Sequence, residues 1–260
     1  MINITSSQIS PQLASLFDPH APASLRCFSV LTGFDTGKIL TDDPDSASWG
    51  AVWEPGDGGL YLAGALDAAT IVHIVATLRY DGDVVIQFWD DDPIVNLLPP
   101  EPEYVGSALE FLDRPTSTAD LEAIVHQLPA SYTLHRMNRE LLQRSLWYED
   151  TIRRHVSAEA FLARSLAVCL MHGNTMLCEA STGVSINGVR ELGVITQEQY
   201  RGRGLATITC AYLIQLCAQA GDSTYWNCSA TNVASAAVAR KLGYQSEREY
   251  RLLAWFKSGA

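Results

Sequence analysis

The sequence predicts an α+β protein built from two domains. Its 260 residues exceed the length of a single domain of roughly 100–200 residues. Short apolar runs bounded by Gly, Pro and Asp alternate with longer segments whose apolar residues recur at helical spacing. Apolar residues make up 47% of the chain and charged residues 18%, so we expect a folded core and exclude a disordered chain.

The first half predicts short strands separated by turns rich in Asp, Gly and Pro. The expected strands are Cys27–Leu31, Ala51–Trp53, Leu60–Leu62, Val84–Phe88 and Leu109–Leu112. Asp67 stands where it can cap a helix over Ala68–Tyr80, whose apolar residues recur every three or four positions. A second helix over Ala119–Leu128 ends at Pro129, and we place the domain boundary there.

The second half predicts a denser alternation of strands and helices. The expected domains are therefore a smaller α/β domain over residues 1–130 and a second domain over residues 131–260. Strands are expected over Tyr132–Arg136, Ser165–Met171, Thr175–Ala180, Gly188–Thr196 and Thr224–Cys228, near Tyr244 and over Leu252–Phe256. Helices are expected over Asn138–Trp147, after Ser157, over Gly204–Ala220 and over Val233–Leu242. The sequence shows no internal repeat.

Charge is distributed unevenly along the chain. Residues 1–150 carry 22 acidic and 7 basic groups, whereas residues 151–260 carry 7 acidic and 11 basic groups. The net charge of −11 argues against nucleic acid as the main partner, because phosphate contacts need clustered Lys and Arg. The split indicates a basic half that binds an anionic cofactor and an acidic half that attracts a cationic substrate. Acidic loops that only keep the chain in solution are the alternative.

Location and metal content follow from what the sequence lacks. Its apolar stretches fall short of the ~20 residues of a membrane span, and the N-terminus has no basic flank or apolar region typical of a secretory signal. The six cysteines form no CxxC pair and no zinc spacing with histidine. We therefore expect buried thiols in a cytoplasmic protein, a monomer or homodimer, without metal, membrane or nucleic-acid partners.

The most informative segment follows the strand expected over Gly188–Thr196. It reads Gln199-Tyr200-Arg201-Gly202-Arg203-Gly204 and leads into an amphipathic helix. The first backbone N–H groups of a helix have no partner within it, and the helix dipole adds partial positive charge there. The two glycines let a phosphate approach these amides, and the two arginines add suitable donors. The turn is therefore predicted to bind a pyrophosphate group.

Two common nucleotide motifs fit this chain poorly. A P-loop needs Gly-x4-Gly-Lys-Ser/Thr, and the nearest run, ending at Lys38, is one residue too short and continues with Ile39. A dinucleotide fingerprint needs Gly-x-Gly-x-x-Gly/Ala, and Thr207 stands at its third position.

The turn does match another pattern. Gln199-x-x-Gly202-x-Gly204, after a strand and at the start of a helix, resembles the acetyl-CoA pyrophosphate motif of the GNAT N-acetyltransferases. The segment Asn232–Tyr244 resembles the Asn-x-x-Ser…Lys-Leu-Gly-Phe ending of many such domains. More narrowly, Glu191–Val194, Tyr200–Thr207 and Trp226–Cys228 resemble the zwittermicin-A-resistance-type subfamily. The resemblance covers residues 188–244 at the level of motifs and extends loosely to 131–260.

This resemblance implies a GNAT-like mixed, mostly antiparallel sheet flanked by helices, and an acetyl-CoA site. The strand end around Val194–Thr196 would separate from its neighbour and offer backbone groups to the pantetheine amides. The Gln199–Ala206 segment would wrap the pyrophosphate. The residues expected to contact the cofactor are Val194, Ile195, Thr196, Gln199, Arg201, Gly202, Arg203, Gly204, Leu205, Ala206, Asn227, Asn232 and Ser235.

The sequence departs from the family where many members carry a tyrosine that protonates the leaving thiolate. Ala239 stands at that position, and Ser235 is the nearest hydroxyl in the segment. An amine attacks a thioester only when neutral, so a base must take its proton. Glu191 is the expected base, and Glu179 is the alternative. If neither glutamate is catalytic, we expect it to be a solvated carboxylate on the strand or to form an ion pair with Arg190.

These residues predict an enzyme that transfers an acetyl group from acetyl-CoA directly to a primary amine of a small cationic molecule. Amine antibiotics and polyamine-like metabolites are examples of such a cationic acceptor. With an amine antibiotic as the acceptor, the protein would be a resistance enzyme. A non-catalytic acyl-CoA-binding sensor or interaction module is the alternative, with Ala239 as its main support. Acetylation of protein N-termini or lysines is a third option, which the large extra domain disfavours.

Overall fold

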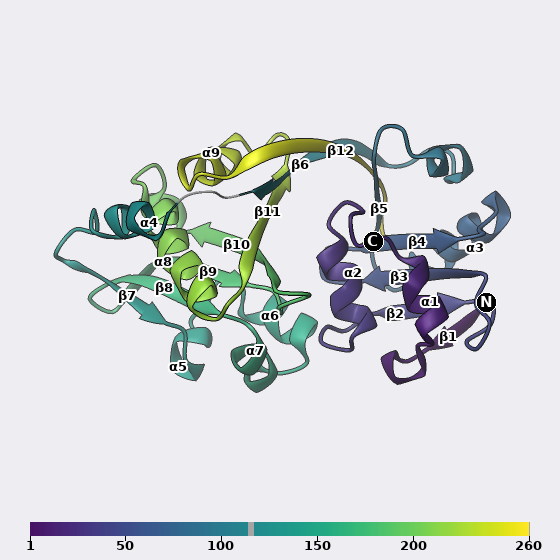
Figure 1. The fold of residues 1–260 in the computed structure, drawn as a ribbon, viewed down its shortest axis with the longest axis horizontal. Coiled ribbons are helices and arrows are strands. Elements are labelled where there is room, and N and C mark those ends of the chain that lie inside the picture. Colours follow the sequence, from purple (N-terminus) through teal and green to yellow (C-terminus); the bar gives the residue numbers. More distant parts are fainter. Residues whose placement is uncertain (114–116, 260) are drawn as a thin grey trace. The chain divides into compact units, whose positions relative to one another are not determined.

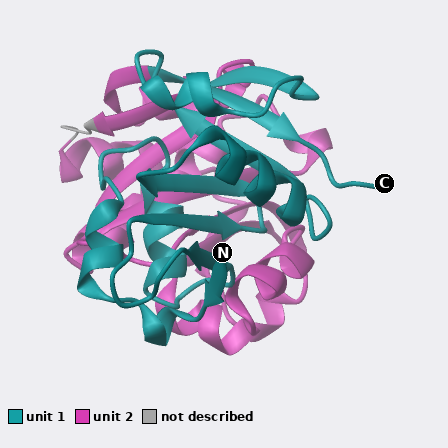
Figure 2. Ribbon diagram, turned by 90° about the vertical axis from the view of Figure 1, so that its right-hand side faces the viewer, with its two compact units in different colours: residues 1–108, 249–260 teal, residues 109–248 magenta. Residues whose placement is uncertain are grey.

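The chain folds into two compact units in the computed structural model, which describes residues 1–113 and 117–259 (Figures 1 and 2). Unit 1 contains residues 1–108 and 249–260, and unit 2 contains residues 109–248. Each unit contains part of a 12-stranded sheet and has its own hydrophobic clusters. Within the described residues, no helix is long and apolar enough to cross a membrane.

Unit 1 is a mixed sheet with helices on both faces. Its strand order is β1-β2-β3-β4-β5-β12, in which only β4 and β5 run parallel. The strands are β1 (Ile2–Ile4), β2 (Lys38–Thr41), β3 (Trp49–Glu54), β4 (Gly59–Gly64), β5 (Val84–Phe88) and β12 (Gln245–Trp255). The helices are α1 (Pro11–Leu16), α2 (Ser24–Leu31), α3 (Ala68–Leu78) and the 3-10 turns η1 (Ser6–Gln8) and η2 (Pro93–Leu97). Helices α1 and α2 share one hydrophobic cluster with the sheet, and α3 shares another.

Unit 2 is also a mixed sheet between two helical layers (Figure 1). Its strand order is β6-β11-β10-β9-β8-β7; β10 and β11 are parallel, whereas β7 through β10 pair antiparallel. The strands are β6 (Tyr104–Asp113), β7 (Tyr132–Arg136), β8 (Ala167–His172), β9 (Thr175–Thr182), β10 (Val189–Thr196) and β11 (Ser223–Ser229). The helices are α4 (Thr118–Val125), α5 (Arg139–Leu142), α6 (Tyr148–His155), α7 (Ala158–Arg164), η3 (Glu198–Tyr200), α8 (Leu205–Gln219) and α9 (Val233–Lys241). The expected mixed, mostly antiparallel sheet flanked by helices is confirmed.

The two units repeat one order of elements. In both, a strand is followed by helices, three strands, one helix and a strand parallel to the preceding one: β1 corresponds to β7, β2–β4 to β8–β10, α3 to α8, and β5 to β11. One more strand follows each series. Strand β6, which follows the first series, lies next to β11, and β12, which follows the second series, pairs with β5. The repeat is therefore one of topology, although the sequence shows none.

Several predicted elements differ from the structure. The two strands expected near Tyr244 and over Leu252–Phe256 are one strand, β12. The strand expected over Cys27–Leu31 is instead the end of α2, because Cys27, Val30 and Leu31 lie on one helical face that is buried against the sheet. The helix expected over Asn138–Trp147 ends at Leu142, and α6 begins only at Tyr148. Between them the backbone N–H of Leu146 donates to the Glu179 carboxylate, a tertiary contact that helical spacing cannot reveal.

The compact units divide the chain at other residues than the expected boundary at 130. Helix α4, which precedes Pro129, packs against α8 and so belongs to unit 2. Strand β12 pairs with β5 from Arg251 to Trp255, which places the C-terminal segment in unit 1. Both differences arise from pairing across long sequence separations.

The six cysteines are buried with free thiols, and desolvation raises the pKa of Cys27 and Cys210 well above its ordinary value.

Helix α3 depends on its N-cap, which the sequence predicted. The Asp67 carboxylate accepts a hydrogen bond of 2.7 Å from the backbone N–H of Thr70. We expect Asp67→Ala to lower the urea midpoint of unfolding, because the N-cap hydrogen bond to the Thr70 backbone N–H is lost. Asp67→Asn keeps a capping oxygen and should shift the midpoint much less; equal midpoints for wild type and the alanine variant would contradict the assignment.

Candidate functional site

Strands β10 and β11 run parallel for three residues and then separate. Their register pairs Val189 with Ser223 and continues only to Glu191 with Tyr225, while β10 stays paired with β9 through Thr196. From Leu192 onward, one edge of β10 thus carries backbone groups that β11 does not pair. An extended ligand with amide groups can pair with such an edge as an added strand does.

The eight residues from Gln197 to Gly204 connect β10 to α8. Gly202 and Gly204 have φ values of +74° and +78°, a left-handed conformation that glycine adopts without strain. Gly204 is also the N-cap of α8 and brings no side chain to the first amides of the helix. Residues 201–204 are exposed. The start of α8 is therefore open to an anion, because uncapped N–H groups and the helix dipole point there.

The arginines of this loop are held at its rim. The Nε of Arg201 donates to the Thr196 carbonyl at 3.2 Å, and Arg203 donates to the Gln199 carbonyl at 3.1 Å. The Arg203 guanidinium also lies over the Tyr200 ring, 5.3 Å from its centroid. Both guanidinium groups keep further N–H donors beyond these bonds, since each carries five.

Two glutamines fasten the loop to β9. The Gln197 side chain donates to the Met176 carbonyl, and its backbone N–H donates to the Leu177 carbonyl at 2.9 Å. The Gln199 side chain donates to the Gln197 side-chain oxygen at 2.9 Å. Gln199, which the motif assigns to the cofactor, is thus held by Gln197, which sequence reasoning missed.

The corresponding turn of unit 1 is built differently. Only residues 65–67 connect β4 to α3, against eight residues in unit 2. The Asp67 carboxylate caps the first amides of α3, and its bond from the Thr70 backbone N–H lowers the pKa of Asp67. The negative charge of Asp67 therefore lies at the start of α3, whereas no side chain caps the start of α8. The start of α3 is therefore closed to a phosphate.

Glu191 and Asn227 face each other where the strands separate. The Asn227 side chain donates to the Glu191 carboxylate at 2.9 Å. Arg190, the next residue on β10, pairs with Asp222 instead and also donates to the Gly183 carbonyl. Burial opposes ionisation of Asp222, but the bonds from Ser185 and Arg190 outweigh it and lower its pKa. Glu191 thus lies next to the unpaired edge of β10; its role as a base stays a prediction.

The start of α9 lies beyond the end of β11. The Asn232 side chain caps α9 by accepting from the Ser235 backbone N–H at 3.1 Å. The Ser235 hydroxyl accepts from the indole N–H of Trp226 at 3.1 Å and so ties α9 to β11. Ala239 is fully buried in the cluster that also contains Trp226. That position faces the core and offers no proton donor.

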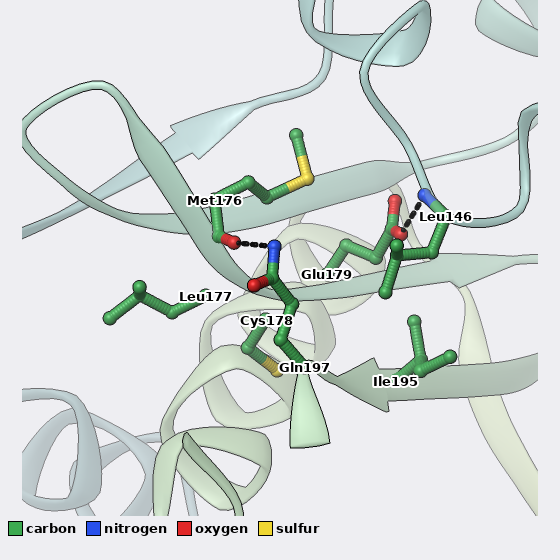
Figure 3. A pocket seen from close by; sticks show the side chains of 7 residues that line it. All are labelled: Leu146, Met176, Leu177, Cys178, Glu179, Ile195 and Gln197. Carbon is green, nitrogen blue, oxygen red and sulfur yellow. Dashed lines mark hydrogen bonds between the residues drawn. The ribbon is translucent and has the colours of Figure 1, made fainter. Parts of the chain in front are cut away.

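Glu179 lines a pocket on β9 and β10 (Figure 3). Glu179 is 3% exposed, and its carboxylate accepts from the backbone N–H of Leu146 at 2.7 Å. Burial raises the pKa of Glu179, and bonds from Ser145 and Leu146 offset part of that rise. The lining residues are Leu146, Met176, Leu177, Cys178, Glu179, Ile195 and Gln197.

Trp147 is a residue of this region that sequence reasoning missed. It is half-buried, and its ring lies over Gly193 of β10, where a Cβ would stand 3.4 Å from Cη2 of the indole. The sequence places Trp147 at the end of an expected helix, so its approach to β10 had no local signal.

Among residues 1–113 and 117–259, no group of three or more His, Cys, Asp or Glu could hold a metal ion.

The structure brings most of the expected site residues to one end of the unit 2 sheet. Because β10 and β11 are parallel, their C-terminal ends share an edge, and the turns that follow them begin there. One turn holds Gln199 to Ala206, and the other leads to Asn232 and Ser235. Leu205 is buried in the core beneath the first turn and contributes packing there.

Comparison with known proteins gives one consistent result. A model of the family described as GNAT acetyltransferase matches residues 16–253. The uncharacterized N-acetyltransferase YdfB of Bacillus subtilis is 27% identical over 128 residues, 48% of this chain, and the match spans about half (49%) of that relative. A GCN5-related N-acetyltransferase-like protein from Streptococcus suis shares the fold with a TM-score of 0.74, 22% identity, and coverage of 97% of this chain and 100% of that one. A tandem GNAT protein from the clavulanic acid biosynthesis pathway has a TM-score of 0.61 at 12% identity, with 98% and 96% covered.

The left-handed conformation of Gly204 predicts a local destabilisation. We expect Gly204→Ala to lower the free energy of unfolding by about 1 kcal/mol, because only its φ is unfavourable and no atom lies within 4 Å of the added Cβ. Gly183→Ala is the matched control, since its Cβ also meets nothing within 4 Å and its φ is not left-handed. Equal thermal midpoints for the two variants would show that the turn does not need this conformation.

Proposed function

The chain belongs to the GNAT acetyltransferase family, and we propose that unit 2 transfers an acetyl group from acetyl-CoA to the primary amine of a small molecule. The separation of β10 from β11 after Glu191 carries this proposal. It leaves an unpaired strand edge that ends at an uncapped helix start flanked by two arginines. An amide-bearing chain that ends in a pyrophosphate has the chemistry to fill both places.

Three groups of residues would hold the donor. The edge over Val194, Ile195 and Thr196 would pair with the amides of the pantetheine arm. Gln199, Arg201, Gly202, Arg203, Gly204, Leu205 and Ala206 would surround the pyrophosphate. Asn227, Asn232 and Ser235 would lie near the thioester end. Acetyl-CoA supplies an activated acetyl carbonyl, and the N–H groups of the β10 edge near Ile195 would stabilise negative charge on its oxygen.

The chemical step needs two proton movements. Glu191 would take the proton that the ammonium group of the acceptor must lose before its nitrogen can attack. A C–N bond then forms, the C–S bond breaks, and the nitrogen gives up its second proton while the departing thiolate takes one. Ala239 cannot pass that proton on, and we assign the transfer to the Ser235 hydroxyl, whose oxygen accepts from Trp226. Ser235 would give its hydrogen to the thiolate and take up the second proton of the nitrogen, so that the net proton of the reaction stays on Glu191.

A small cationic acceptor is the substrate class that the charges favour. Residues 1–150 carry 22 acidic and 7 basic groups, a field that attracts cations over long range. Amine antibiotics belong to this class, in keeping with the narrower resemblance of Glu191–Val194 and Trp226–Cys228 to the zwittermicin-A-resistance type. A non-catalytic acyl-CoA sensor is the second candidate, and the burial of Ala239 in the core favours it.

Release of CoA from acetyl-CoA, followed with a thiol reagent, tests the proposed reaction. We expect release that depends on an amine when polyamines, amino sugars and amine antibiotics are supplied in turn. Glu191→Gln should lower kcat by about 10²-fold or more, because the amide cannot take the proton of the acceptor ammonium group. Glu122→Gln on α4 is the control. Binding of acetyl-CoA without release by any amine would favour the sensor, and an unchanged Glu191→Gln enzyme would contradict the base.

The contrast between the two units predicts one acetyl-CoA per chain. Calorimetry and native mass spectrometry should give a stoichiometry of one, because Asp67 closes the start of α3. Arg201→Ala with Arg203→Ala should weaken binding by about tenfold or more through lost charged hydrogen bonds. Arg139→Ala, at an exposed ion pair with Glu159, is the control. A second equivalent of bound acetyl-CoA would show that unit 1 also binds.

A further inference from the structure

Glu179 differs from Glu191 in what surrounds it. It lies on β9 directly opposite Ile195 of β10 and is nearly fully buried. Figure 3 shows its carboxylate turned toward the backbone N–H of Leu146, in the segment between α5 and α6. A buried carboxylate is stable only when hydrogen bonds replace its lost water, and this one obtains them from that segment.

The carboxylate organises three consecutive residues. Leu146 donates its backbone N–H to Glu179 at 2.7 Å, and the Ser145 hydroxyl bonds to the same carboxylate. The Ser145 oxygen in turn accepts from the backbone N–H of Trp147 at 2.9 Å. Residues 145–147 lie between two helices and have no regular structure. Backbone bonds of the turn hold part of this segment, and Glu179 supplies the bonds that fasten it to β9.

The segment held in this way reaches the strand that carries Glu191. The Trp147 ring lies next to Gly193, where an added Cβ would be in ordinary van der Waals contact with the indole. Side chains alternate along a strand, so Glu191, position 193 and Ile195 are on one face of β10. Trp147 thus covers the strand between Glu191 and Ile195, and the neighbouring Leu146 is 54% exposed. An aromatic ring near a carboxylate suits an ammonium group.

We propose that Glu179 is a positioning residue that holds Ser145–Trp147 over β10, and that Trp147 and Leu146 form the surface on which the acceptor amine binds. This inference rests on the proposed acetyl transfer. It gives the two candidate glutamates different roles: Glu191 exchanges the proton, and Glu179 builds the wall beside it. The substrate class it selects is a cationic amine carried on an apolar group, which contacts Leu146 while its charge lies against the indole ring.

Two substitutions at one position separate positioning from base catalysis. Glu179→Gln keeps an oxygen that accepts from Leu146 but cannot take a proton, whereas Glu179→Ala loses both. With Glu179→Gln we expect kcat to fall far less than in Glu191→Gln, because Glu191 still takes the proton. With Glu179→Ala we expect the KM of the acceptor to rise about tenfold or more while the Kd of acetyl-CoA is unchanged. Trp147→Leu should raise the same KM without altering the pH profile.

A readout independent of activity tests the positioning role. Hydrogen exchange should show that the Leu146 amide is protected in wild type and Glu179→Gln, and that protection falls by about tenfold or more in Glu179→Ala. Circular dichroism and binding of acetyl-CoA verify that each variant is folded. Loss of kcat and of the low-pH limb in Glu179→Gln would overturn the proposal and make Glu179 the base. An unchanged acceptor KM in Glu179→Ala and Trp147→Leu would overturn the binding surface.

Failure of the proposed function gives a different result. Wild-type protein that binds acetyl-CoA but releases no CoA with any amine would remove the transfer reaction and the acceptor surface together. Protection of the Leu146 amide by Glu179 would still be measured in that case. A Leu146 amide that exchanges equally fast in all three proteins would overturn the positioning role whatever the activity.

Discussion

Strands β10 and β11 are paired for three residues, up to Glu191, and then diverge. A parallel pair that continued would satisfy its backbone groups and leave no place for a ligand. Because β10 stays bound to β9 as far as Thr196, the divergence exposes one edge of an otherwise rigid strand. The open start of α8, the arginines of the loop and the Glu191–Asn227 contact all lie at or beyond the point of divergence.

The two units share one topology but differ in how the helix that follows β4 or β10 begins. In unit 1, β4 and β5 also pair in parallel for only a short distance, at Gly59 and Leu60. The short connection to α3 then ends in Asp67, whose carboxylate satisfies the helix start from within the chain. In unit 2 a longer connection ends in Gly204, which has no side chain to do so. A single capping carboxylate thus separates a helix that is complete by itself from one that can accept an anion.

The carboxylates of unit 2 also illustrate that burial and catalysis are separate properties. Glu179 has the raised pKa that often marks a functional site, yet its oxygens are engaged by the chain itself. Glu191 is less buried and lies where a substrate nitrogen could reach it. In our proposal the more perturbed group shapes the site, and the more accessible group reacts.

Local sequence determined a large part of this protein. Hydrophobic spacing and turn residues predicted β5, β7, α3 and α8 to within a few residues, since each forms from contacts along one segment of the chain. The glycine and arginine pattern of Gln199–Gly204 predicted a turn between a strand and a helix start, because these elements are contiguous in sequence; the anion site at that turn stays a prediction. Only the tertiary structure decided where β10 leaves β11, that α2 is a helix, and that β12 pairs with β5. It also decided that Glu179 holds residues 145–147 against a strand nearly 50 residues away. Such contacts join segments that are far apart in the sequence, and the local pattern of one segment carries no information about the other.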